Sequence, residues 1–137
     1  MNLANSLQRI ALHDPHRPAV FEGSRLLRTY AALADRAARL AASLRAAGLQ
    51  PGDRVALFMR NHPAYLEALY GCWWAGLAVV PTNAKLHLRE AQWIVDHSQA
   101  RWAFVTADVG DGLNAPDRVI EVTSAAYEAL FALPPSP

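Results

Sequence analysis

Residues 51–86, PGDRVALFMRNHPAYLEALYGCWWAGLAVVPTNAKL, decide the fold of this 137-residue chain. The stretch contains two short apolar runs of strand length, residues 55–58 and 78–81. Between them lies a longer apolar segment, residues 64–75, of helical length. Two apolar strands that are joined by a helix of about a dozen residues are typical of a parallel β-α-β unit. The sequence therefore predicts such a unit at the centre of the fold.

Proline and glycine residues mark the boundaries of this unit. Pro51-Gly52-Asp53 is a turn signal directly before the first strand. Pro63 is placed to start the helix, because a proline in the first helical turn loses no hydrogen bond. Gly76 is placed to end the helix before the second strand begins.

The flanking sequence extends this α/β pattern on both sides. Before the central unit we expect a helix at residues 3–12, a hairpin with strands 19–21 and 26–28 around a turn at 22–25, and a helix from the capping residue Thr29 to Ala47 with Gly48 after it. After the unit we expect a helix at 88–98, a loop at 108–116, a helix from Thr123 through Phe131, and an extended tail at 134–137. The predicted fold is α/β, a partial and mainly parallel sheet covered by helices with the small hairpin at its margin. Its strands are expected near residues 54–59, 78–81, 102–106 and 119–122.

Composition and charge exclude several classes of function. The net charge of +1 gives no indication of binding to nucleic acid or to an anionic membrane. Charged residues make up 18% of the chain, below the ordinary share of about 25%. Two explanations of this deficit are equally good: part of the surface is covered by another protein segment or partner, or the chain is rich in small, exposed alanines. Cys72 is the only cysteine, so the chain cannot form an internal disulfide.

Neither a leader nor a membrane span is predicted. The N-terminus has no charged region followed by an apolar run, so we expect no signal peptide and a cytoplasmic protein. Residues 64–81 contain a single charge, Glu67, but Gly71 and Gly76 interrupt them. A spanning helix needs about 20 apolar residues. A buried helix followed by a buried strand is the better interpretation.

Motifs of common catalytic and binding sites are missing. Neither GxGxxG nor GxxxxGK[ST] occurs, so the glycines do not form a phosphate loop. The histidines, at positions 13, 16, 62, 87 and 97, have no metal-ligand spacing, and no serine lies in a nucleophile elbow. We expect no catalytic residue and no metal ligand in this chain.

A series of short motifs runs in order from about Leu3 to Thr106. They are Thr29-Tyr30 with Leu33, Gly48-Leu49, Pro51-Gly52-Asp53-Arg54-Val55-Ala56, Asn61, Ala75-Gly76, Val79-Val80-Pro81, Asn83, Leu86, Glu90 and Ala100-Arg101. Each motif is weak alone, but the ordered set resembles the N-terminal part of the adenylate-forming (AMP-binding) enzymes. Within this family the closest branch is that of the acyl-CoA synthetases, or fatty-acid–CoA ligases, and the long-chain or malonyl type is the nearest in our interpretation.

The resemblance implies an activity for a longer parent enzyme. Such an enzyme activates a carboxylate with Mg-ATP and then transfers the acyl group to the thiol of CoA. Its phosphate-holding loop, a Ser/Thr/Gly-rich segment that ends in Pro-Lys-Gly, its later nucleotide motifs and its catalytic lysine would all follow Pro137. We therefore expect residues 1–133 to be an N-terminal subdomain and residues 134–137 the end of a proline-rich linker.

The same resemblance determines what we expect of the chain alone. It should be inactive and should not bind ATP, Mg or CoA tightly, and its partner should be the remainder of the synthetase. Exposed apolar surface could also support a homo-oligomer.

Lys85 is the one candidate binding residue. It follows the strand at 78–81, and ligands of open parallel sheets lie outside the carboxyl ends of the strands. Relatives often have arginine or lysine here, in a region that lies near the CoA phosphates in some acyl- and aryl-CoA ligases. We hypothesise that Lys85 contacts a CoA phosphate; a solvated loop lysine is the alternative.

Two other functions stay open. A stand-alone copy of this half-domain could be an interaction or scaffold protein without catalysis. A general α/β nucleotide-binding module is a third possibility, although the missing glycine-rich loop counts against it.

Overall fold

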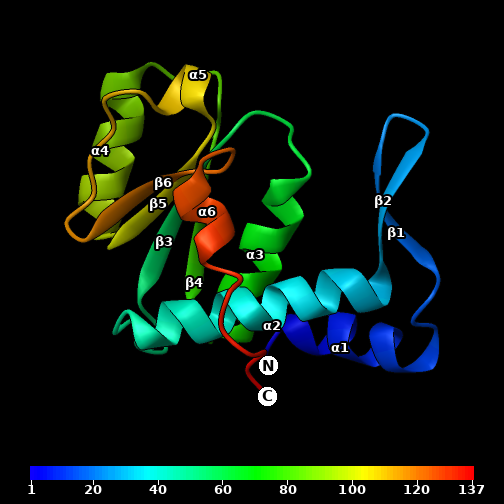
Figure 1. Cartoon of the computed structure of the whole chain (residues 1–137). Helices are drawn as coiled ribbons and strands as arrows, with labels where there is room; N and C mark the ends of the chain where they lie inside the picture. Colours follow the sequence, from blue (N-terminus) through cyan, green and yellow to red (C-terminus); the bar gives the residue numbers. More distant parts are fainter.

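Four parallel strands form the central sheet of the computed structural model, which describes residues 1–137. The strands are β3 (Arg54–Phe58), β4 (Ala78–Thr82), β5 (Trp102–Val105) and β6 (Arg118–Glu121), in the spatial order β4-β3-β5-β6 (Figure 1). All three neighbouring pairs are parallel. The predicted parallel sheet and its four strand positions are confirmed.

Helices cover both faces of this sheet. On one face lie α2 (Tyr30–Ala46), α3 (Ala64–Trp74) and α6 (Ala125–Ala129), which enclose a core with Val55 and Leu57 of β3. On the other face lie α4 (Leu88–Ser98) and α5 (Ala107–Gly110), which pack on a second core with Ala56 and Phe58. Alternate residues of β3 thus point to opposite faces, and apolar residues fill both because both faces are covered.

The N-terminal segment lies beside this layered body. It comprises α1 (Ala4–His13) and an antiparallel hairpin of β1 (Pro18–Glu22) and β2 (Arg25–Thr29). The helix packs against α2 and α3, whereas the hairpin projects from the body beyond the start of α2 (Figure 1). A third, smaller core joins the hairpin to α2 through Val20 and Leu33. The expected marginal hairpin and its turn at 22–25 are confirmed.

Two local signals act as expected at the ends of α2. The Thr29 hydroxyl accepts a hydrogen bond from the backbone N–H of Ala32 at 3.2 Å, which satisfies one free donor of the first turn. Gly48 has a φ of +94°, a backbone conformation that residues with a Cβ rarely adopt, and it ends the helix after Ala47.

Part of the predicted loop at 108–116 is wrong. Ala107–Gly110 form the short helix α5, in which Gly110 packs directly against the side chain of Val105. Four residues are too few to show helical periodicity, so this turn has no signal in the sequence. The last helix begins with the capping residue Ser124 and ends earlier than expected, at Ala129.

The final residues lie against α2 and α3. The backbone N–H of Ser136 donates to the carbonyl of Ala38 at 2.9 Å, and the indole N–H of Trp74 donates to the carbonyl of Ser136 at 3.1 Å. Both termini therefore lie close together at this end of the molecule (Figure 1). No helix combines the length and the apolar character that crossing a membrane requires.

Candidate functional site

The carboxyl ends of β3 and β4 form a crevice because the chain leaves them in opposite directions. After β3 it turns to α3 on one face of the sheet, and after β4 it turns to α4 on the other face. Loops that separate in this way leave an opening at the strand ends, and this is the place where open α/β sheets bind ligands.

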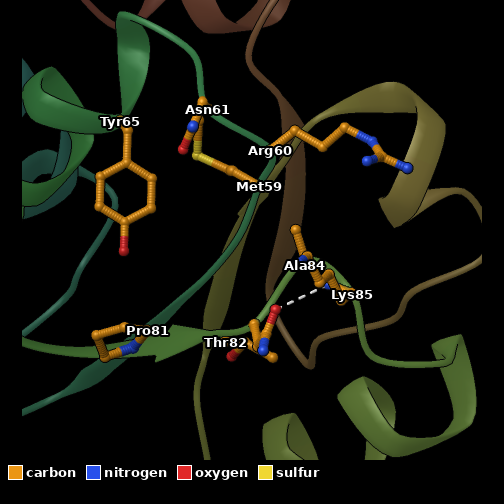
Figure 2. A pocket seen from close by; sticks show the side chains of 9 residues that line it. Met59, Arg60, Asn61, Tyr65, Pro81, Thr82, Ala84 and Lys85 are labelled. Atoms are coloured by element: carbon orange, nitrogen blue, oxygen red, sulfur yellow. Dashed lines mark hydrogen bonds between the residues drawn. The ribbon is translucent and has the colours of Figure 1, made fainter.

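An open hollow of about 450 Å³ lies at this crevice (Figure 2). Its lining comes from the end of β3, the start of α3 and the residues after β4: Met59, Arg60, Asn61, Tyr65, Pro81, Thr82, Asn83, Ala84 and Lys85. Most of these side chains are polar, and the two charged ones are both cations. The hollow is therefore suited to a polar ligand that carries negative charge.

Lys85 lies where the sequence places it, at the rim of this hollow. Its backbone N–H donates to the side-chain oxygen of Asn83 at 2.9 Å, which fixes the turn after β4. Its ammonium group is exposed and forms no ion pair within the protein. The charge of Lys85 is therefore available to a ligand.

Arg60 is a second cation of the hollow, and the sequence analysis did not identify it. Its backbone N–H donates to the Thr106 hydroxyl at 3.0 Å, and its guanidinium forms an ion pair with Asp108 of α5. Partial desolvation would raise the pKa of Asp108, but the Thr106 hydroxyl and the Arg60 charge outweigh it and hold that pKa below its ordinary value. The signal in the sequence was the position of Arg60 two residues after a buried strand.

Glu67 forms a separate, buried network, with only 5% of its side chain exposed. Arg36 donates to both of its carboxylate oxygens at 2.9 Å, the Tyr127 hydroxyl donates at 2.9 Å, and Arg28 forms a further ion pair. These residues come from β2, α2, α3 and α6. The network therefore connects the hairpin to the body of the protein, and its groups are occupied with one another rather than free for a ligand.

The pKa values in this network shift in opposite directions. Burial raises the pKa of Tyr127, and the adjacent negative charge of Glu67 raises it further. Burial also tends to raise the pKa of Glu67, but the hydrogen bonds and charge of Arg36, the charge of Arg28 and the Tyr127 hydroxyl lower it more. Glu67 is consequently ionised and Tyr127 protonated at neutral pH.

Two residues of the recognised motifs pair at the opposite, amino edge of the sheet. The Arg101 guanidinium donates to the Asp53 carboxylate at 2.6 Å and to Asp117 at 2.7 Å. The backbone N–H of Gln50 also bonds Asp53, and this bond together with Arg101 holds the pKa of Asp53 below its ordinary value. Asp53 and Arg101 therefore fix the turns before β3 and β5 and lie far from the hollow.

The hollow presents polar side chains and two cations but no carboxylate. No group of three or more potential metal ligands occurs in the structure. The single thiol, Cys72, is fully buried, and burial raises its pKa to about 12, so it is no nucleophile. What remains is a polar crevice with two cations.

Comparisons with known proteins agree with this architecture. A family model described as AMP-binding enzyme matches residues 7–132. Among characterised relatives, a feruloyl-CoA synthase of an Amycolatopsis species is 42% identical over 128 residues, which are 92% of this chain and 24% of that enzyme. A fatty acid–[acyl-carrier-protein] ligase, ScoC of Streptomyces coeruleorubidus, is 40% identical over 73% of this chain and 19% of its own length.

Solved structures show the same fold. The N-terminal domain of FACL13 from Mycobacterium tuberculosis superimposes with a TM-score of 0.86 at 30% identity, over 100% of this chain and 38% of that one. A benzoate CoA ligase from Burkholderia xenovorans LB400 gives a TM-score of 0.87 at 26% identity, over 99% of this chain and 29% of that one. The chain thus spans about a quarter of the length of the first of the characterised relatives.

Proposed function

Because this chain belongs to the family of AMP-binding enzymes, we propose that it is the N-terminal part of an ATP-dependent acyl-CoA synthetase. The whole enzyme would activate a carboxylate as its adenylate, using Mg-ATP, and then form a thioester with CoA. In this proposal the remainder of the synthetase is the partner of the chain. Residues beyond it would supply the phosphate loop and the catalytic lysine, and residues 1–133 would form the N-terminal subdomain.

The observation that supports the proposal most is the hollow at the carboxyl edge of the sheet. Lys85 presents a free ammonium group there, and the hollow contains no acidic side chain. A CoA phosphate is the ligand group that best suits this arrangement, because an ammonium binds phosphate as a point charge. Lys85 would therefore bind CoA and take no part in the chemical steps.

The 137-residue chain on its own is expected to be inactive. It contains neither a glycine-rich phosphate loop nor the Pro-Lys-Gly segment of the family, so we do not expect it to position the triphosphate for reaction. The measurement is release of AMP or pyrophosphate by the purified chain with Mg-ATP and a panel of fatty and aromatic carboxylates. Carboxylate-dependent consumption of ATP would contradict the expectation.

Replacing Lys85 with alanine in the whole enzyme is expected to raise the KM for CoA about tenfold, because a charge-assisted hydrogen bond contributes about 1.5–3 kcal/mol. The KM values for ATP and for the carboxylate should stay the same. Arg89→Ala is the matched control, since Arg89 is an exposed cation of α4 that does not line the hollow. An unchanged KM for CoA in the Lys85 variant would refute the proposal that Lys85 binds a CoA phosphate.

A stand-alone interaction domain without catalysis is the second candidate, and one surface feature favours it. Phe21 and Leu26 are cross-strand neighbours on the projecting hairpin, with 52% and 47% of their surfaces exposed. Such an apolar pair could contact a second copy or another protein. Reading the coding DNA after the Pro137 codon separates the two candidates. A frame that continues into a Thr/Ser/Gly-rich loop ending in Pro-Lys-Gly supports the synthetase, and an immediate stop codon supports the interaction domain.

A further inference from the structure

We propose that Arg60 is a second phosphate-binding cation of the hollow, and that Asp108 holds its guanidinium aside until a phosphate group enters. The inference rests on the proposed function in one respect, namely that the ligand of the hollow is a phosphate ester such as CoA. It adds a residue and an exchange of ion pairs to that function.

The backbone of Arg60 is held in place, whereas its guanidinium group can move. Its N–H donates to the hydroxyl of the buried Thr106, so the end of β3 is tied to the end of β5. The side chain itself is 61% exposed. Figure 2 shows it leaving the end of β3 on the side away from Tyr65. A long arginine side chain anchored in this way can change its direction without moving the sheet.

The partner that now holds Arg60 is weakly bound to it. Asp108 is 52% exposed, and an ion pair between two such side chains is screened by water and salt. A phosphate ester offers more, because it carries up to two charges and accepts two parallel N–H bonds from one guanidinium. Arg60 should therefore exchange Asp108 for phosphate when such a ligand occupies the hollow.

The surroundings of the hollow favour this exchange. Arg60 and Lys85 both line it, and they come from adjacent strand ends, those of β3 and β4. Two cations at one opening can bind different oxygen atoms of the same phosphate-containing anion. The side-chain amide of Asn61 and the Tyr65 hydroxyl, both of which line the hollow and bond no other residue, add neutral hydrogen-bonding groups.

The test is a titration of the 137-residue chain with inorganic pyrophosphate at low ionic strength, followed by the NMR shifts of the backbone amides around the hollow. Arg60→Ala should raise the Kd about tenfold, in line with loss of one charge-assisted contact. Asp108→Asn should lower it about threefold, because Arg60 is released. In the double variant, Arg60→Ala with Asp108→Asn, the substitution at Asp108 should not lower the Kd, because its effect acts through Arg60.

Matched controls separate this effect from a general change in charge. Arg25→Ala removes a cation from another exposed ion pair, with Glu22 on the hairpin, and should leave the Kd unchanged. Asp111→Asn removes an exposed acid three residues from Asp108 and should also have little effect. Melting curves of all variants should coincide, because every substituted side chain is exposed.

Three results would overturn the inference: no binding of pyrophosphate at all, an Arg60→Ala variant that binds like the parent chain, or equal gains from Asp108→Asn and Asp111→Asn. Lys85→Ala distinguishes it from the proposed function. If Lys85→Ala weakens binding and Arg60→Ala does not, only the present inference fails. If the reverse holds, Arg60 is confirmed as the phosphate ligand and the role of Lys85 is refuted.

Discussion

Replacing Glu67 with alanine is expected to destabilise the fold by about 3–5 kcal/mol, the typical cost of removing one member of a buried ion pair. The substitution would leave the guanidinium of Arg36, which is only 16% exposed, without the carboxylate that binds it twice. It would also deprive the Tyr127 hydroxyl of its acceptor. The measurement is urea unfolding at pH 7, followed by tryptophan fluorescence.

Two further variants show whether charge or shape is responsible. Glu67→Gln keeps the size and one acceptor oxygen but removes the charge, so it should lose less stability than the alanine variant. Glu22→Ala removes an acid from an exposed ion pair of the hairpin and should change stability by at most about 0.5 kcal/mol. A Glu67→Ala protein as stable as Glu22→Ala would refute the structural role of the network.

The pH dependence of stability follows from the direction of the Glu67 shift. The pKa of Glu67 in the folded protein lies below its ordinary value of 4.5, because its cationic neighbours outweigh the effect of burial. The stabilisation is therefore complete above that ordinary value and is lost as the pH falls through the lower, folded-state pKa. The parent chain should lose stability more steeply than Glu67→Gln in this acidic range.

The parts of the fold that the sequence predicts are those with local causes. The strands at 55–58 and 78–81 are short apolar runs between turn residues, and burial on both faces requires this composition. Thr29 and Gly48 mark the ends of α2 through bonds and backbone angles within a few residues of themselves. The position of Lys85 at the carboxyl edge follows from the same parallel topology.

The parts that the sequence does not predict depend on distant partners. Glu67 meets Arg28, Arg36 and Tyr127, which lie 39, 31 and 60 residues away in the chain. The sequence shows only that Glu67 is the single charge in an apolar segment, and this pattern does not indicate a buried network. Arg60 likewise pairs with Asp108 only because β3 and β5 are neighbours, an order that local patterns do not specify.

Replacing Gly71 with valine is expected to destabilise the chain by about 3 kcal/mol, toward the upper end of the usual cost of overpacking. Gly71 lies where α3 crosses α2. A Cβ placed on it would come within 2.5 Å of Cδ2 and 2.8 Å of Cγ of Leu40. Leu40 is fully buried in the core, so its side chain can move only if its neighbours move as well. The two helices would have to separate, and equilibrium unfolding in urea would measure the cost.

A compensating change at Leu40 tests this cause directly. Gly71→Ala should cost less than the valine variant, because alanine adds one methyl group and gains about 1 kcal/mol of helix propensity over glycine. Leu40→Ala alone should cost about 2–5 kcal/mol through the cavity that it leaves. If the contact of Gly71 with Leu40 is what limits the approach of α2 and α3, the valine at 71 will fill part of that cavity. The loss of unfolding free energy in the double variant should then be smaller than the sum of the two single losses by about 1 kcal/mol or more. Additive losses would instead place the constraint in the helix backbone of α3 rather than in its packing against α2.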